Sequence, residues 1–125
     1  MSRVPARFDP TIHAAHRLRV CGLLADLKEL EFAVLRDTLS LSDSVLSKQL
    51  AILAQAGYVR SRRAKRDSRQ RVWLALTPGG RRAFSGHVAA LREIVGDADQ
   101  RQASPATRSG SEAGAARPIV AEGMG

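Results

Sequence analysis

Apolar residues between positions 18 and 27 recur with the spacing of one helix face. The positions i, i+3, i+4 and i+7 hold Val20, Leu23, Leu24 and Leu27. Leu18 and Cys21 widen this stripe, so we expect burial on two sides. Upstream, Asp9-Pro10 offers an N-cap followed by a proline at the first helical position, where its missing N–H costs nothing. The pattern predicts a helix from Pro10 to about Leu27.

Two further helices and a tight turn are predicted next. An extended piece at 29–31 leads into a helix over about 32–39, whose apolar side carries Phe32, Leu35 and Leu39. After the turn Ser40-Leu41-Ser42, Ser42 is a good N-cap for a third helix that continues through Ala56. Gly57 then ends the third helix, because glycine readily takes the left-handed conformation.

The third helix has an apolar side and a small, polar side. Its core side is predicted to carry Leu46, Leu50 and Leu53, and its opposite side Ser44, Ser47, Lys48, Ala51 and Gln55. A DNA major groove admits an α-helix, and small hydrogen-bonding side chains can approach the base edges there. Asp43, at the helix start, suits the helix dipole.

After Gly57 the apolar spacing changes from helical to alternating. Val59 and Ser61 alternate with arginines, and further along the alternating apolar positions are Val72, Leu74 and Leu76. This pattern predicts a β-hairpin with its turn between Lys65 and Arg69, where Asp67-Ser68 supplies polar turn residues.

Thr77-Pro78 repeats the cap-and-proline arrangement and predicts a last helix to about Gly96. One face of that helix carries Phe84, Val88, Leu91 and Val95. Residues 98–125 have no aromatic side chain and repeat Ala, Gly, Ser and Pro, a composition that predicts a disordered tail.

The net charge points to an anionic partner. The chain has 20 Lys and Arg against 12 Asp and Glu, a formal charge of +8. Residues 98–125 are neutral overall, so the whole excess lies in residues 1–97. The stretch "SRRAKRDSRQRV", residues 61–72, holds six of the cations: Arg62, Arg63, Lys65, Arg66, Arg69 and Arg71. Nucleic acid, an acidic protein and an anionic membrane surface are all compatible with this charge.

The predicted order of helices and strands is that of a winged helix-turn-helix, a mainly α fold with a small β-hairpin (α+β), over residues 8–97. Three stretches resemble winged-helix transcriptional regulators of the MarR and ArsR-like families: "FDPTIHAAHRLRVCGLLADL", "EFAVLRDTLSLSDSVLSKQLAILAQAGYV" and "LTPGGRRAF". The resemblance covers roughly residues 8–96. It implies that Ser42 to Gln49 begin the recognition helix and that Lys65 to Arg69 form the wing tip.

No cofactor, metal or enzymatic activity is predicted. ArsR-type metal sensors usually hold a cysteine pair in or near the recognition helix, and this helix has no cysteine. His13, His16 and Cys21 supply too few ligands for a metal site, and the lone Cys21 is best explained as a buried packing residue. The sequence lacks the Gly-x-Ser-x-Gly and phosphate-loop motifs of common enzymes and any run of ~20 apolar residues.

These observations predict a cytoplasmic, sequence-specific transcriptional regulator that binds double-stranded DNA as a homodimer, with repression as the expected role. The third helix would enter the major groove, and the wing would contact the backbone or minor groove. The predicted DNA-binding residues are Ser42, Asp43, Ser44, Ser47, Lys48, Gln49, Arg60, Arg62, Arg63, Lys65, Arg66, Arg69 and Arg71. The predicted dimer interface comprises Leu18, Phe84, Val88, Leu91 and Val95.

Two other functions remain open from the sequence. The winged helix could dock acidic proteins through the same arginines, or the protein could coat the nucleoid without sequence preference. A small-molecule effector stays unknown, since only one helix is predicted on each side of the DNA-binding motif.

Overall fold

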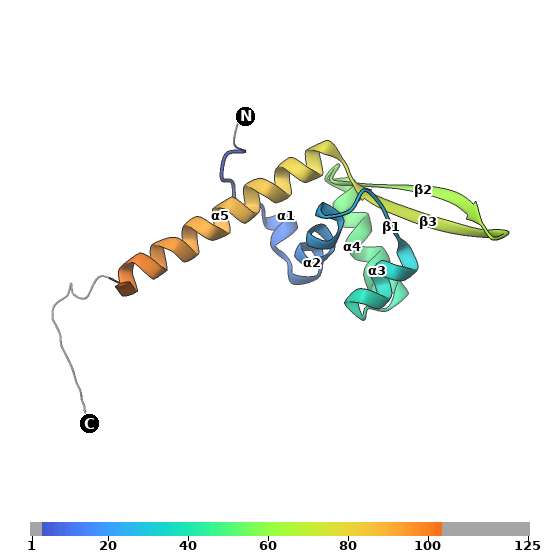
Figure 1. Ribbon diagram of the computed structural model, residues 1–125, viewed down its shortest axis with the longest axis horizontal. Coiled ribbons are helices and arrows are strands. Elements are labelled where there is room, and N and C mark those ends of the chain that lie inside the picture. The colour runs from blue at the N-terminus through green and yellow to red at the C-terminus, as the bar shows by residue number, and fades with distance from the viewer. Residues whose placement is uncertain (1–3, 104–125) are drawn as a thin grey trace, which may run out of the picture. The chain divides into compact units, whose positions relative to one another are not determined.

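The computed structural model describes residues 4–103, which form five helices and a three-stranded antiparallel sheet. The chain divides into two compact units, Met1–Ala90 and Leu91–Gly125. The first unit holds α1 (Pro10–His13), α2 (Ala15–Ala25), β1 (Leu30–Glu31), α3 (Phe32–Leu39), α4 (Asp43–Gln55), β2 (Val59–Arg66) and β3 (Arg69–Leu76). Helix α5 (Pro78–Ala103) begins in the first unit and ends in the second. This order confirms the predicted winged helix-turn-helix (Figure 1).

One hydrophobic core joins the helices of the first unit to the sheet. Leu46, Leu50 and Leu53 of α4 are buried, as their spacing predicts. The same core contains Ile12, Val20, Cys21, Leu24, Leu35, Leu39, Val59, Leu74 and Leu76. A fully buried leucine contributes roughly 1.5–3 kcal/mol, so packing of this kind, rather than helix propensity, holds the short helices α3 and α4 in place.

The three predicted N-caps are present. A side-chain oxygen accepts a hydrogen bond from the first turn at Asp9 for α1, Ser42 for α4 and Thr77 for α5, at 2.9, 3.2 and 2.9 Å. Gly57 has a φ of 82°, the left-handed conformation expected where α4 ends. The starts of these helices and the end of α4 therefore follow from local sequence.

The single helix predicted from Pro10 to about Leu27 is wrong, because the segment forms two helices. Ala14 has a ψ of 136°, which takes it out of the helical conformation and separates α1 from α2. The break allows Ile12 to be fully buried alongside Val20 of α2. Helix α2 ends at Ala25, and Leu27 is 43% exposed. The helical periodicity starts only at Leu18, so it carries no information about the chain before that point.

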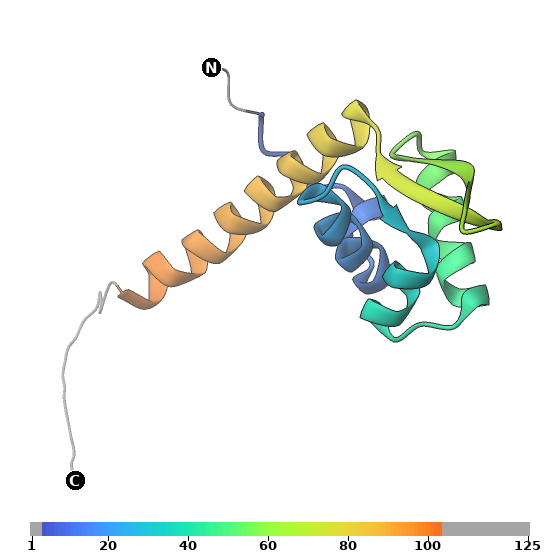
Figure 2. The ribbon, with the colours of Figure 1, turned by 45° about the vertical axis from the view of Figure 1, so that its right-hand side comes forward.

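The sheet has the strand order β1-β3-β2. Strands β2 and β3 pair over their full eight residues from Val59↔Leu76 to Arg66↔Arg69, and β1 adds only two pairs to β3. Asp67 and Ser68 form the two-residue turn with φ values of 55° and 64°. Positive φ at both central positions is the mark of a type I′ turn, whose twist matches that of the strands. Figure 2 shows the hairpin, in yellow-green, beside α4, in green.

Helix α5 is longer than predicted. It ends at Ala103, whereas the sequence pattern placed its end at about Gly96. The first part of the predicted disordered tail, residues 98–103, is therefore helical, and the rest of that tail lies outside the described residues. Residues 97–102 are polar apart from Ala98 and contain no proline or glycine, so nothing in them stops a helix that has already begun. Across residues 4–103, none of the helices combines the length and apolar character needed to span a membrane.

Candidate nucleic-acid interface

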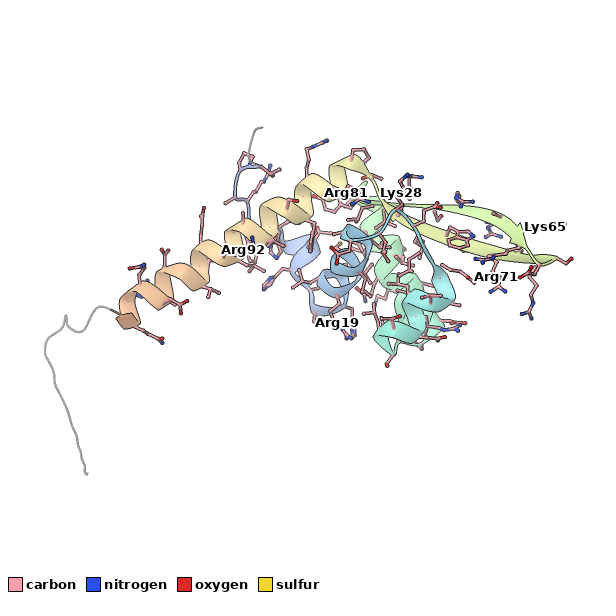
Figure 3. The ribbon with its side chains drawn as sticks, in the orientation of Figure 1. Arg19, Lys28, Lys65, Arg71, Arg81 and Arg92 are labelled. Carbon is pink, nitrogen blue, oxygen red and sulfur yellow. The ribbon has the colours of Figure 1, made fainter. Side chains whose placement is uncertain are left out.

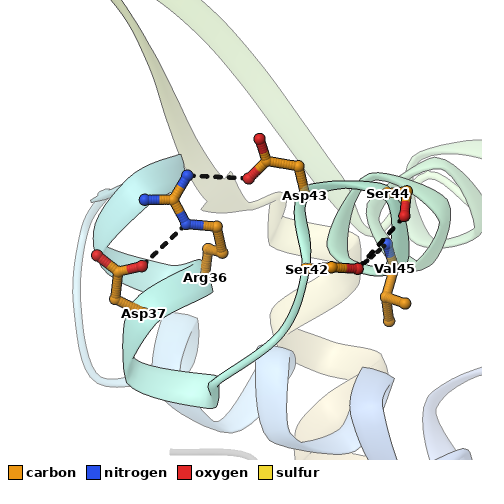
Figure 4. A network of polar contacts seen from close by, with 6 residues as sticks. All are labelled: Arg36, Asp37, Ser42, Asp43, Ser44 and Val45. Carbon is orange, nitrogen blue, oxygen red and sulfur yellow. Dashed lines mark hydrogen bonds and ion pairs between the residues drawn. The ribbon is translucent and has the colours of Figure 1, made fainter.

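Arg36 joins the last turn of α3 to the first turn of α4. Its Nη1 donates to Asp43 and its Nε donates to Asp37, each at 2.9 Å (Figure 4). The hydrogen bond from Arg36 lowers the pKa of the Asp37 carboxyl, and the pKa of Arg36 is raised by Asp37 first and then by Asp43. A guanidinium therefore stands beside Asp43, whose charge would otherwise repel a nearby phosphate. Arg36 was not among the residues predicted from sequence.

The outer side of α4 presents small and polar groups to solvent. Ser44, Ser47 and Lys48 are all exposed, as is the capping Ser42, whose Oγ lies 3.3 Å from Oγ of Ser44. Val45 is 36% exposed in the same turn, although the sequence pattern did not single it out. Hydroxyls and an ammonium can hydrogen-bond base edges, and an apolar group can contact a thymine methyl.

Gln49 is partly buried and accepts a hydrogen bond within the domain. Its Oε1 accepts a hydrogen bond from Nη1 of Arg17 on α2 at 2.9 Å, and Nε of Arg17 donates to the carbonyl of Thr11. Arg17 thus ties α2 both to α4 and to α1. The structure thus gives Gln49 a partner within the protein, and its predicted contact with DNA stays a prediction.

The basic residues of the wing fall into two groups. No hydrogen bond or ion pair within residues 4–103 engages the side chains of the first group, which consists of Arg60, Arg63, Lys65, Arg66 and Arg69. All five are exposed, and Lys65 lies near the far end of the hairpin (Figure 3). The positive charges of these five side chains are therefore not neutralised by acids in the described part of the chain.

The second group, Arg62 and Arg71, forms ion pairs with one acid just before β1 and one acid within it. Arg62 donates to both carboxylate oxygens of Glu29 at 2.6 and 2.7 Å, and its guanidinium lies 5.6 Å from the ring centroid of Trp73. Arg71 donates to Glu31 at 2.6 Å. The hydrogen bond from Arg62 lowers the pKa of Glu29, and Glu29 in turn raises the pKa of Arg62. Sequence reasoning found these arginines but not the glutamates that hold them.

A hollow of about 320 Å³ lies between α4 and the part of the β2–β3 hairpin farthest from its turn. Ser47 and Ala51 line it from α4, and Ser61, Val72 and Leu74 line it from the hairpin. The face of the hairpin that carries these three residues therefore looks toward α4. Because residues alternate between the faces of a strand, Arg63 and Lys65 continue this face toward the wing tip.

Two of the three histidines form a contact within the first unit. His87 is fully buried; its Nδ1 accepts from the Asp9 backbone N–H at 2.9 Å, and its Nε2 lies 3.2 Å from Nδ1 of His13. Burial lowers the pKa of His87, with a smaller contribution from His13. The described part of the chain has no cluster of three or more His, Cys, Asp or Glu side chains that could hold a metal ion.

Cys21 is a buried packing residue, as predicted. It is fully buried in the core, and burial raises the pKa of its thiol to about 12, with a smaller contribution from Asp9. The thiolate, which is the reactive form, is therefore strongly disfavoured.

The predicted dimer residues occupy different environments. Leu18 and Phe84 pack against the core of the first unit, and Val88 is partly buried. In the second unit Leu91 is partly buried, whereas Val95 is 58% exposed. Ile94, which the sequence pattern did not select, is 55% exposed.

Solved structures with a similar fold include several transcriptional regulators. A transcriptional regulator homologue from Pyrococcus horikoshii OT3 is 19% identical, with a TM-score of 0.68 over 71% of this chain and 88% of that chain. HlyU from Vibrio cholerae is 27% identical, with a TM-score of 0.51 over 67% of this chain and 83% of that one. ZitR from Lactococcus lactis, a zinc-responsive MarR family member, is 17% identical, with a TM-score of 0.54 over 84% of this chain and 69% of that one.

A search of the curated proteins finds no match to this sequence. The family model described as a winged helix DNA-binding domain matches residues 16–95. This match spans α2 to α5, including the helix-turn-helix and the basic wing, and it covers more than half of the chain. The chain therefore belongs to the family of winged helix DNA-binding domains.

Proposed function

We propose that this protein is a sequence-specific transcriptional regulator in which α4 reads base edges and the wing binds the sugar-phosphate backbone. One observation carries the proposal: a helix with an exposed polar side lies next to a hairpin on which five cations form no ion pair within residues 4–103, and two of them, Arg63 and Lys65, continue the hairpin face that looks toward α4. Contacts to phosphate position a protein on DNA, and contacts to base edges provide the specificity. This domain has groups suited to each task on separate elements.

Helix α4 supplies the base readout. Ser44, Ser47 and Lys48 are exposed on its outer side, and the Ser42 cap and the Arg36–Asp43 pair hold its first turn in place. A recognition helix usually contacts bases through its N-terminal residues. Because these contacts form before DNA is bound, they reduce the ordering cost of binding.

The wing supplies most of the electrostatic attraction. Five unpaired cations on the hairpin and Lys48 on α4 can each neutralise a phosphate. If about 5 phosphates are neutralised per subunit, log K falls against log salt with a slope of roughly −4 to −5. The wing would follow the backbone or an adjacent minor groove.

A homodimer is the form that we expect to bind DNA. One small domain contacts few base pairs, and a symmetric dimer doubles the site with half-sites about one helical turn apart. In the second unit, Leu91, Ile94 and Val95 provide apolar surface for a second copy. Repression would then follow if the dimer occupies a promoter and excludes the polymerase.

Selection from a pool of randomised duplexes tests the proposal without a known operator. The wild-type protein should enrich a short motif that repeats with two-fold symmetry. Lys48→Ala should lose discrimination between the selected and a scrambled duplex. Lys65→Ala, at the wing, serves as the matched control and should weaken binding to both duplexes alike. If the wild-type pool yields no motif while binding tracks salt, the protein binds DNA without sequence preference.

A further inference from the structure

Two of the arginines in the wing are already occupied by acids of the same chain. The residues Glu31, Trp73 and Arg62 stand opposite one another in a row across β1, β3 and β2. Arg62 reaches past the Trp73 ring to Glu29, and Glu31 pairs with Arg71. Both ion pairs therefore lie on one face of the sheet.

That face is the one turned away from α4. The neighbouring row of paired residues, Leu30, Leu74 and Ser61, belongs to the opposite face, and Leu74 and Ser61 line the hollow beside α4. Arg63 pairs with Val72 in the sheet and shares this second face. Arg62 and Arg71 therefore share their face with arginines that form no ion pair within residues 4–103, namely Arg60, Arg66 and Arg69. What sets Arg62 and Arg71 apart on this face is their bond to a glutamate.

We propose that Glu29 and Glu31 are positioning residues that set the number of phosphates the wing neutralises. Glu29 holds Arg62 and Glu31 holds Arg71, so neither arginine binds a phosphate. The duplex is then bound only by the unpaired cations. This inference rests on the proposed DNA-binding function and extends it to two residues that make no contact with DNA themselves.

The physical consequence is a limit on nonspecific affinity. Phosphate contacts carry no sequence information, and every added contact strengthens binding to all duplexes alike. The bidentate geometry of the Arg62–Glu29 pair competes with a phosphate for the same donors, because phosphate also prefers both nitrogens of a guanidinium. The glutamates thereby preserve the ratio of specific to nonspecific binding.

The Arg62–Glu29 pair is tested by a double-mutant cycle of Glu29→Gln and Arg62→Gln in the full chain. Binding to a short, labelled duplex of mixed sequence is followed by fluorescence anisotropy over a range of salt, and the slope of log K against log salt is compared. We expect Arg62→Gln to leave the slope unchanged. Glu29→Gln should steepen it by about 0.9, the value for one additional phosphate. The double variant should return to the wild-type slope.

Asp67→Asn is the matched control, since it removes one negative charge from the wing tip and Asp67 forms no ion pair within residues 4–103. Its effect on the slope should be the same with Arg62 present or replaced. Circular dichroism establishes that each variant is folded. If the Glu29 variant fails to fold, Arg62→Gln alone still decides, because its slope is predicted to equal that of the wild type.

Three outcomes would overturn the inference. A slope that becomes shallower by about 0.9 in Arg62→Gln means that Arg62 contacts phosphate in spite of Glu29. A Glu29→Gln variant that is folded but weaker, with no steeper slope, assigns Glu29 a purely structural role. In both cases the proposed function stands if the wild type binds duplex, whereas a wild type that binds no duplex overturns both proposals.

Discussion

The Nε2 atom of His87 lies 3.2 Å from Nδ1 of His13, and this contact joins α5 to α1. The other ring nitrogen of His87 accepts a hydrogen bond from the backbone N–H of Asp9. His87 therefore carries its proton on Nε2, and this N–H donates a hydrogen bond to Nδ1 of His13. The ring centroids of Phe8 and His87 are 4.8 Å apart, so Phe8 packs against this pair.

The cluster predicts that stability falls in mild acid. Burial holds the pKa of His87 below its ordinary value of 6.5, so between these two pKa values the unfolded chain binds more protons than the folded protein. The free energy of unfolding should be constant above about pH 6.5, decrease as the pH falls through that value, and level off below the pKa of the folded state. Urea denaturation across a series of pH values measures it.

His87→Gln should remove this part of the acid sensitivity, because glutamine does not titrate. His16→Gln, at an exposed position, is the control and should retain it. An unchanged loss of stability at low pH in His87→Gln would show that other groups cause it.

Gly80 is required by its contact with Tyr58. A Cβ at position 80 would lie 2.9 Å from the carbonyl carbon of Tyr58 and clash with the backbone there. We expect Gly80→Ala to lower the free energy of unfolding by about 1–3 kcal/mol, as overpacking does. Gly79→Ala makes only ordinary contacts and should change it by less than ~0.5 kcal/mol. Thermal denaturation of both variants checks the difference, and equal effects would contradict the assignment.

The local elements of this domain could be predicted from its sequence. Helices α3 and α4, the hairpin and the three N-caps depend on residues within a few positions of one another, such as Ser42 and its helix. The break at Ala14 could not be predicted, because it follows from the burial of Ile12 against distant parts of the chain. The extension of α5 beyond Gly96 could not be predicted, because the polar composition of the segment is equally compatible with a disordered chain.

The same distinction applies to the candidate site. The basic residues and the polar side of α4 are visible in the sequence, because they are defined by composition and spacing. The partner of Arg62 is 33 residues away and that of Arg71 is 40 residues away, so only the fold reveals which cations are occupied. The contact of Gln49 with Arg17 is hidden for the same reason.

We predict that one substitution in the wing turn raises the free energy of unfolding. Ser68 has a φ of 64°, a conformation that costs a non-glycine residue roughly 1–2 kcal/mol. Because glycine itself loses about 0.5–1 kcal/mol of chain entropy on folding, Ser68→Gly should stabilise the protein by up to about 1 kcal/mol. Thermal denaturation gives the change, and Ser61→Gly, within strand β2, should instead destabilise. A loss of stability in Ser68→Gly would contradict the assigned turn.

Arg36 is predicted to matter for DNA binding without touching the bases. Arg36→Ala leaves the charge of Asp43 uncompensated at the start of α4, so binding to a duplex should weaken. The free energy of unfolding should change little, because the ion pairs are exposed and screened by solvent. Adding Asp43→Asn should recover most of the lost affinity in an anisotropy titration. If the double variant binds as weakly as Arg36→Ala alone, charge compensation is not the role of Arg36.

The most direct test of the central claim is the binding of this protein to a duplex from the upstream region of its own gene, compared with a scrambled duplex of equal length. Fluorescence anisotropy at low and at near-physiological salt gives both affinities. We predict that the native duplex binds about 10³-fold more tightly or better, and that the difference persists as the salt is raised. Equal binding to the two duplexes, with both lost in salt, would contradict sequence-specific recognition at this site.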